Sequence, residues 1–195
     1  MYTREQWANL IHTEPHRIGH LIGFKDLTPL HSEWMKSMLF AREDQTLQGH
    51  RGSYKTTVLS LTEALLLVWQ PNNNILFFRK TDTDVGEVIT QTSKILQGPV
   101  FQIMVNDLYG CSLVLPTDTK SEITTNLTTS PRGVSQLIGL GIGTSITGKH
   151  ADIVITDDIV NVKDRISQAE REHTKLAYQE LQNIKNRGGR FINTG

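Results

Sequence analysis

The stretch LQGHRGSYKTT, Leu47 to Thr57, carries the strongest structural signal in this chain. Its glycines, lysine and threonine come close to the spacing G-x-x-x-x-G-K-[ST] of a loop that binds phosphate groups. Such a loop joins a strand to a helix and surrounds the anion with backbone N–H groups. Tyr54 departs from the pattern, because a glycine is usual at that position. The surrounding sequence must therefore show whether the loop is present.

Strands and helices alternate on both sides of this stretch. One predicted strand, residues 44–48, is polar where a central strand would be apolar. The other predicted strands are short and mostly apolar: ILFF (75–78), SLVLPT (112–117), EITTNL (122–127), SQLIGLGIG (135–143), ADIVITDD (151–158) and RFINTG (190–195). The predicted helices are apolar all round or amphipathic: 55–70, 85–96 and 166–184. Short strands alone are expected from Pro99 to Gly148, and Gly188-Gly189 are expected to end the last helix.

The order of these segments predicts an α/β fold with a mostly parallel sheet. Ligands of such sheets bind at the carboxyl ends of the strands. Residues 1–43 read as a helical lead-in, with helix-start signals at Thr3, Pro15 and Thr28-Pro29. We therefore expect a lead-in over residues 1–43 and a core over residues 44–195.

Composition narrows the function classes. A chain of 195 residues with 37% hydrophobic residues is expected to form one compact unit. Lysine plus arginine equals aspartate plus glutamate at 20 each, so no overall positive field attracts nucleic acid or an anionic membrane. One cysteine, Cys111, excludes an internal disulfide framework, and we expect it to be a small core residue. The start lacks the apolar core of a signal peptide, and the apolar run 64–69 is too short to span a bilayer, so we expect a soluble intracellular protein.

Hydrolysis of a nucleotide needs a lysine and N–H groups around the phosphates, a hydroxyl and an aspartate for Mg²⁺, and a carboxylate that orients water. Lys55 would contact the phosphates and Thr56 would reach Mg²⁺. Asp157 would hold Mg²⁺ and Asp158 would orient the water. Each pair also has a structural interpretation, since Lys-Thr can begin any helix and Asp-Asp can cap the next one. Their occurrence together, in this order, favours the nucleotide site.

Other polar residues are open to two interpretations. Arg51 is either a solvated loop charge or a contact to the terminal phosphate. The pair Arg79-Lys80 follows a buried strand, where ordinary strand-end charges are the simpler interpretation. His173 lies on the apolar stripe of the last helix, which indicates packing and not catalysis.

The order GHRGSYKTT, SITGKHADIVITDD and FINTG resembles the ATPase domain of the large terminase subunit of tailed bacteriophages, over residues 40–195. The resemblance implies a P-loop NTPase of the RecA-like, additional-strand class, a three-layer sandwich. It implies that Mg²⁺ is bound by Thr56 and Asp157, and that ATP binds at Gly49, His50, Arg51, Gly52, Ser53, Tyr54, Lys55, Thr56 and Thr57. Arg51 then matches the family's loop arginine, Asp157 its Walker B aspartate and Asp158 its catalytic carboxylate. Thr194-Gly195 matches its coupling motif.

The resemblance also implies partners. ATP hydrolysis in this family drives double-stranded viral DNA into a procapsid, in the cytoplasm of the infected bacterium. The implied partners are the portal protein, the small terminase subunit and further copies in a ring, with a monomer expected in isolation and no membrane. A nuclease domain would follow Gly195. Because phosphoryl-transfer sites often take an arginine from a neighbouring subunit, Arg79 is a candidate for that donor, with Arg51 as the alternative within the chain.

Two rival interpretations remain. One is another RecA-like or helicase-type ATPase, although the span shows no helicase motifs. The other is a degenerate nucleotide-binding module that serves assembly. It is supported by Tyr54 in place of glycine and by Asp158, which is one methylene shorter than the usual glutamate.

Overall fold

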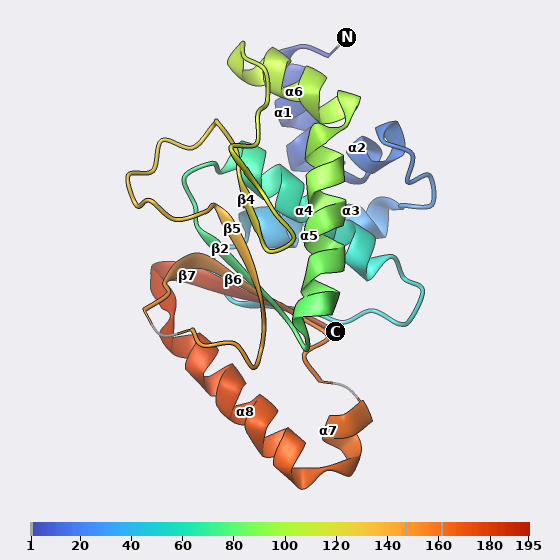
Figure 1. Ribbon diagram of the computed structural model, residues 1–195. Helices are drawn as coiled ribbons and strands as arrows, with labels where there is room; N and C mark the ends of the chain where they lie inside the picture. Colours follow the sequence, from blue (N-terminus) through green and yellow to red (C-terminus); the bar gives the residue numbers. More distant parts are fainter. Residues whose placement is uncertain (1, 147, 161) are drawn as a thin grey trace.

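The chain folds around one mixed sheet, seen in the computed structural model, which describes residues 2–146, 148–160 and 162–195 (Figure 1). Within these residues the seven strands are β1 (Gln45–Leu47), β2 (Ile75–Arg79), β3 (Thr117–Asp118), β4 (Glu122–Thr124), β5 (Leu137–Gly141), β6 (Ala151–Asp157) and β7 (Lys185–Thr194). The helices are α1 (Arg4–Thr13), α2 (His16–Leu21), α3 (Pro29–Phe40), α4 (Lys55–Trp69), α5 (Asp82–Gln97), α6 (Pro99–Tyr109), α7 (Val162–Ile166) and α8 (Gln168–Asn183).

The strand order β1-β7-β6-β2-β5-β4-β3 brings the ends of four strands together. The strands β1, β7, β6, β2 and β5 are parallel, and only β4 and β3 run antiparallel to their neighbours. Leu47 of β1 pairs with Thr194 of β7, which pairs in turn with Asp157 of β6. Phe78 of β2 pairs with Thr156, so Arg79 is next to Asp157. The register thus gathers the predicted site residues at one sheet edge.

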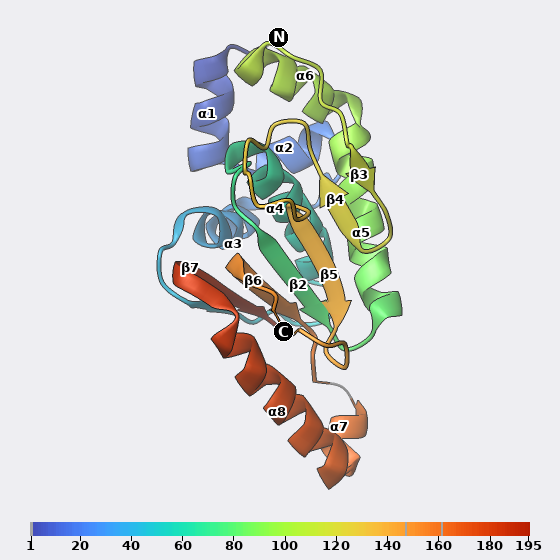
Figure 2. The same cartoon turned by 60° about the vertical axis from the view of Figure 1, so that its left-hand side comes forward.

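Helices cover both faces of the sheet, which confirms the predicted three-layer α/β fold (Figure 2). Side chains alternate between the faces along a strand. In β2, Ile75 and Phe77 join the larger core cluster with α4 and α5, whereas Leu76 and Phe78 join a smaller cluster on the face covered by α8. Because α4 lies between the sheet and further helices, every residue from 58 to 68 is buried, as its apolar sequence predicts.

The N-terminal helices form as their start signals predict. Thr3 and Gln6 make a capping box at α1, and Thr28 begins α3 with Pro29 in the first turn. Leu39 of α3 belongs to the same core cluster as α4. The lead-in therefore packs directly on the helix that follows the glycine-containing loop, although the division at residue 43 stays a prediction.

Several local predictions are wrong. Residues 99–109 form helix α6 and not a strand region, because Pro99 is suited to the first turn of a helix. Of SLVLPT, only Thr117 is in a strand. The helix predicted over 166–184 is confirmed as α8, but it begins two residues later, because Ser167 caps it and Ile166 belongs to α7. Gly188-Gly189 do not end a helix but lie inside β7, which is irregularly paired with β6 in that region.

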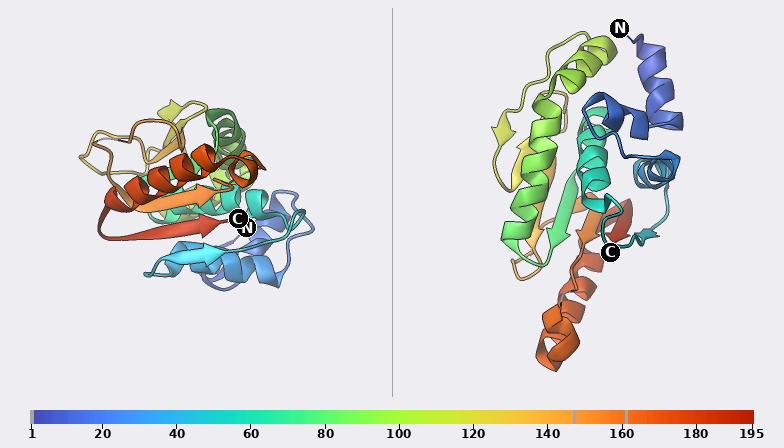
Figure 3. Two further views of the ribbon diagram at one scale, coloured as in Figure 1. Left: turned by 90° about the horizontal axis from the view of Figure 1, so that it is seen from below. Right: turned by 90° about the vertical axis from the view of Figure 1, so that its right-hand side faces the viewer.

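Helices α7 and α8 extend beyond the sheet as a hairpin (Figure 3). The first part of α8 therefore has little to pack against, and Ile166 and Leu176 are exposed. His173 is exposed as well, so the prediction that it packs is wrong. Cys111 is half-buried against the main core. In the part of the chain that the structure describes, no helix combines the length and the apolar character needed to cross a bilayer.

Candidate functional site

The loop between β1 and α4 has the backbone geometry of an anion cradle. Gly49 begins it, with its N–H donating to the carbonyl of Gly195 (3.0 Å). A Cβ atom at Gly49 would lie 2.6 Å from Oγ of Ser53 and 3.0 Å from Cγ of Lys55, so a larger residue there would displace side chains of the loop. Gly52 adopts a left-handed φ of 86°. Helix α4 begins at Lys55, and the first-turn N–H groups of a helix have no partner within it.

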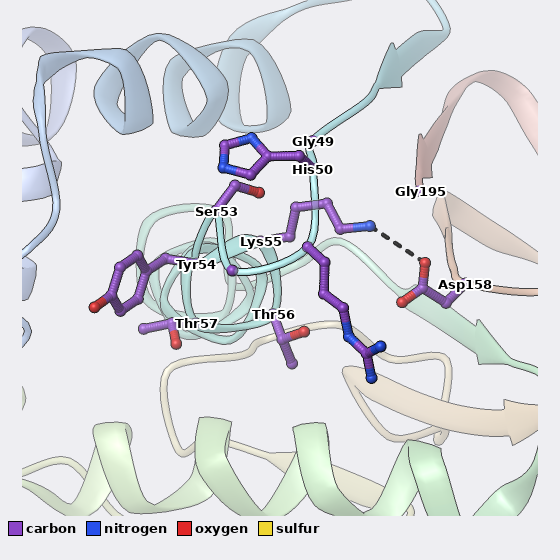
Figure 4. Close-up of a pocket in the computed structure, with 11 residues that line it drawn as sticks. Gly49, His50, Ser53, Tyr54, Lys55, Thr56, Thr57, Asp158 and Gly195 are labelled. Carbon is purple, nitrogen blue, oxygen red and sulfur yellow. Dashed lines mark hydrogen bonds and ion pairs between the residues drawn. The ribbon is translucent and has the colours of Figure 1, made fainter.

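A cavity of about 810 Å³ opens over this loop (Figure 4). That volume lies within the range of roughly 300–1,000 Å³ that is common for small-molecule sites. Every residue predicted to bind ATP lines it, together with Asp158 and the last glycine: Gly49, His50, Arg51, Gly52, Ser53, Tyr54, Lys55, Thr56, Thr57, Asp158 and Gly195. Arg51 is exposed there, and Oγ of Ser53 is buried with no hydrogen-bond partner in the described structure.

The two carboxylates at the end of β6 differ in environment. Asp157 is fully buried, and one of its oxygens accepts a hydrogen bond from the hydroxyl of Thr194 (2.6 Å). Burial raises the pKa of Asp157, against the opposing effects of that hydrogen bond and of the cation Arg79. The side chain of Asp158 is about half exposed and forms an ion pair with the ammonium group of Lys55 (3.2 Å). The predicted metal ligand thus lies behind the cavity wall, and the predicted catalytic carboxylate faces the cavity.

The backbone is strained on both sides of the cavity. Among the described residues, Tyr54 and Asp158 are the two that are not glycine and have a left-handed φ, at 58° and 46°. Such conformations cost roughly 1–3 kcal/mol each and concentrate at functional sites. The N–H of Asp158 donates to the carbonyl of Thr194 (3.2 Å), which holds this turn in place.

Thr194-Gly195 join the loop to the acids. Thr194 contacts Asp157 through its hydroxyl, and the N–H of Gly195 donates to the carbonyl of Leu47 (3.1 Å). The two residues of the predicted coupling motif therefore contact both the buried carboxylate and the start of the loop. A movement of the loop would therefore change the position of the buried carboxylate, and the reverse, through these hydrogen bonds.

Arg79 and Lys80 have separate environments. The guanidinium group of Arg79 lies against both carboxylates, with Nε 3.1 Å from Asp157 Oδ2 and Nη2 3.5 Å from Asp158 Oδ2. Lys80 points to the α7–α8 hairpin, where its ammonium group contacts Asp164 (2.9 Å). The structure thus places Arg79 against the two acids and Lys80 away from them.

Two supports of the loop were not predicted. The hydroxyl of Tyr54 donates to Asp26, which precedes α3 (2.7 Å). His31 accepts from the N–H of Thr28 at Nδ1, so Nε2 carries the proton and donates to the carbonyl of Ser53 (3.1 Å). The histidine at the third position of α3 was the available signal, but its contact spans 22 residues of sequence. The lead-in thus holds the loop in its strained form.

Glu63 is a further group that the sequence analysis did not single out. It lies fully buried in α4 and accepts a hydrogen bond from the hydroxyl of Thr92 in α5 (2.8 Å). Burial raises the pKa of Glu63 to about 8, with Asp157 acting in the same direction. Glu63 is therefore protonated at neutral pH. A lone glutamate within an apolar helix was the available signal.

The fold is similar to that of a solved phage large terminase. The large terminase of bacteriophage HK97 is 12% identical, with a TM-score of 0.55 over 94% of this chain and 38% of that one. The ATPase domain of the large terminase of Thermus phage P74-26 matches at 14% identity and a TM-score of 0.44, and a mutant of it at 12% and 0.48; both cover 80% of this chain. This chain spans 60% of that domain's length. No family model and no curated relative matches.

Proposed function

We propose that this chain binds ATP together with Mg²⁺ and hydrolyses it, as the ATPase domain of a DNA-packaging motor. One observation carries the proposal. The sheet register brings the glycine-containing loop and Asp158 to one cavity, with Asp157 and Thr194 directly behind its wall, although more than a hundred residues of sequence separate the loop from the two acids. A helix start at the Lys-Thr pair and a helix cap at the Asp-Asp pair would not require the two pairs to lie close together.

Each residue has a role that its position supports. Lys55 and the loop N–H groups bind the phosphates, since they meet at the N-terminus of α4. When the phosphates bind, the ammonium group of Lys55 would turn toward them and share its charge between phosphate and Asp158, which it contacts at 3.2 Å. Asp158 then orients the attacking water from the cavity wall. Arg51, exposed at the same cavity, is available to contact the terminal phosphate.

The residues present fit a magnesium ion. Oδ2 of Asp157 is buried and has no hydrogen-bond partner in the described structure, although Arg79 Nε is 3.1 Å away. Thr56 lines the cavity, and hydroxyl and carboxylate oxygens are the donors that Mg²⁺ prefers. Thr56 and Asp157 would hold the ion, which when bound neutralises charge on the transferred phosphoryl group. Thr194 keeps Asp157 oriented through its hydroxyl.

The packaging role rests on the shared fold with the HK97 large terminase and on the sequence resemblance. We propose that the chain acts on double-stranded viral DNA at the procapsid portal, in the host cytoplasm. The portal protein, the small terminase subunit and further copies of the chain are its proposed partners. Stimulation of ATP turnover by double-stranded DNA would favour this motor over an ATPase of another kind.

Hydrolysis separates the proposed ATPase from the rival, a degenerate assembly module. If the chain is an ATPase, purified protein should bind MgATP and release phosphate, and Lys55→Ala should lose binding while it keeps its fold. Asp158→Asn should bind MgATP and lose phosphate release, since asparagine tolerates the left-handed backbone but carries no charge. Asp157→Ala should weaken Mg²⁺-dependent binding as well.

Two substitutions of exposed residues are matched controls. Lys120→Ala and Asp118→Asn remove the same side-chain charges at the far edge of the sheet, and both should leave binding and turnover unchanged. If wild-type protein bound MgATP but released no phosphate, alone or with DNA, the module would be the better interpretation. Equal turnover by Asp158→Asn and wild type would refute the role of Asp158.

A further inference from the structure

Arg79 is held by its own chain at three points. Its side chain is only 14% exposed, and its three guanidinium nitrogens face three different acceptors. Nε lies beside Asp157 and Nη2 beside Asp158. Nη1 donates to the backbone carbonyl of Asp84 in the first turn of α5 (3.3 Å). Arg79 therefore joins both carboxylates to a helix of the same subunit.

This geometry does not suit an arginine that is donated to a neighbour. Such a side chain must reach out of its own subunit to a phosphate in the next one. If Arg79 did so, it would give up its contacts with Asp157, Asp158 and the carbonyl of Asp84 together, and until a metal ion binds, the fully buried Asp157 would lack a paired cation. A buried charge without a partner is strongly unfavourable. The sequence-based hypothesis of a trans donor thus has no support in the position of Arg79.

Arg79 becomes more important for holding Asp158 when a nucleotide phosphate binds at the loop. In the structure, Asp158 is held by two cations, Lys55 and Arg79. In the proposed function Lys55 is the phosphate ligand of the loop, so a bound phosphate would share its charge and weaken its hold on Asp158. Arg79 is then the cation that keeps its contact with the Asp158 carboxylate, at 3.5 Å between Nη2 and Oδ2.

We propose that Arg79 is a positioning residue that acts in cis: it orients Asp158 for turnover and holds Asp157 and α5 in register with it. This inference rests on the proposed ATPase function. It predicts a larger effect on kcat than on nucleotide affinity, since Arg79 contacts the acids and does not line the phosphate cavity.

The test compares Arg79→Ala and Arg79→Lys with wild type by direct MgATP binding and by steady-state turnover. For Arg79→Ala we expect a Kd within about threefold of wild type and a loss in kcat of about 100-fold, the usual scale for one preorganised polar contact. Arg79→Lys keeps the buried charge, and so the fold, but it cannot span three acceptors. It should recover part of kcat. The matched control is Arg132→Ala, whose ion pair with Asp152 (2.8 Å) lies at the opposite end of β6.

A mixture of subunits separates cis from trans action. Assemblies of Arg79→Ala with Lys55→Ala should stay inactive, because the subunits that bind ATP lack their own arginine. Recovery of turnover in such assemblies, or a kcat of Arg79→Lys and Arg79→Ala equal to that of wild type, would overturn the inference. A larger loss of affinity than of kcat would also overturn it. If wild type itself failed to bind ATP, the proposed function would fall first and this inference with it.

Discussion

The buried carboxyl group of Glu63 should dominate one part of the pH dependence of stability. Its pKa is about 8 in the folded protein, against an ordinary value of 4.5, chiefly because burial disfavours the charged form. Between these values the folded protein keeps a proton that the unfolded chain has lost. Stability therefore falls as the pH rises through this window, by about 1.4 kcal/mol per pH unit.

Replacement of Glu63 by glutamine removes this titration and keeps the shape of the side chain. Between pH 5 and pH 8, wild type should lose at most about 4 kcal/mol relative to Glu63→Gln. Groups that do not interact with Glu63 titrate in the same way in both proteins and cancel in the difference. The amide should be tolerated, because Thr92 can still donate to its oxygen, as it does to the glutamate (2.8 Å).

Urea unfolding of both proteins at several pH values between 5 and 8 measures this difference directly. The gap between the two free energies of unfolding should widen steadily with pH. Thr92→Val provides a control with a predicted direction, because the hydrogen bond from Thr92 lowers the pKa of Glu63. Its loss should extend the window to higher pH. Parallel pH profiles for wild type and Glu63→Gln would refute the reasoning.

Two further substitutions test the supports of the site. Tyr54 has a φ of 58°, so the variant Tyr54→Gly should be more stable than Tyr54→Ala by about 1 kcal/mol in thermal or urea unfolding. This order is the reverse of the one found in helices. If Tyr54→Ala were the more stable variant, the backbone at this position would not be strained. Lys80→Met removes the cation beside Asp164, whose side chain is 2% exposed, and should cost about 3 kcal/mol. Lys185→Met, which breaks a pair with the half-exposed Asp44, should cost less than about 1 kcal/mol, and equal losses would argue against the burial argument.

Local sequence patterns were sufficient for the order of the central elements. The apolar run of α4, the strand ILFF and the strand that ends in Asp157-Asp158 are all present as predicted. These elements are buried on most sides, so their apolar periodicity reflects their surroundings directly. The polar strand 44–48 is explained by its place at the edge of the described sheet. The loop residues that line the cavity could also be predicted from the sequence, because they are consecutive in the chain.

Contacts between distant parts of the chain determined the surroundings of Arg79 and the exposure of His173. The sequence offered Arg79 as a donor to a neighbour, but the register of β2 beside β6 puts it against Asp157 of its own chain. The amphipathic pattern of α8 predicted burial of His173, but the hairpin extends past the sheet edge, and that residue is exposed. Periodicity records which face of a helix is apolar and contains no information on whether a neighbour reaches it. Strand order and register supply that information, and they arise from contacts between residues far apart in the chain.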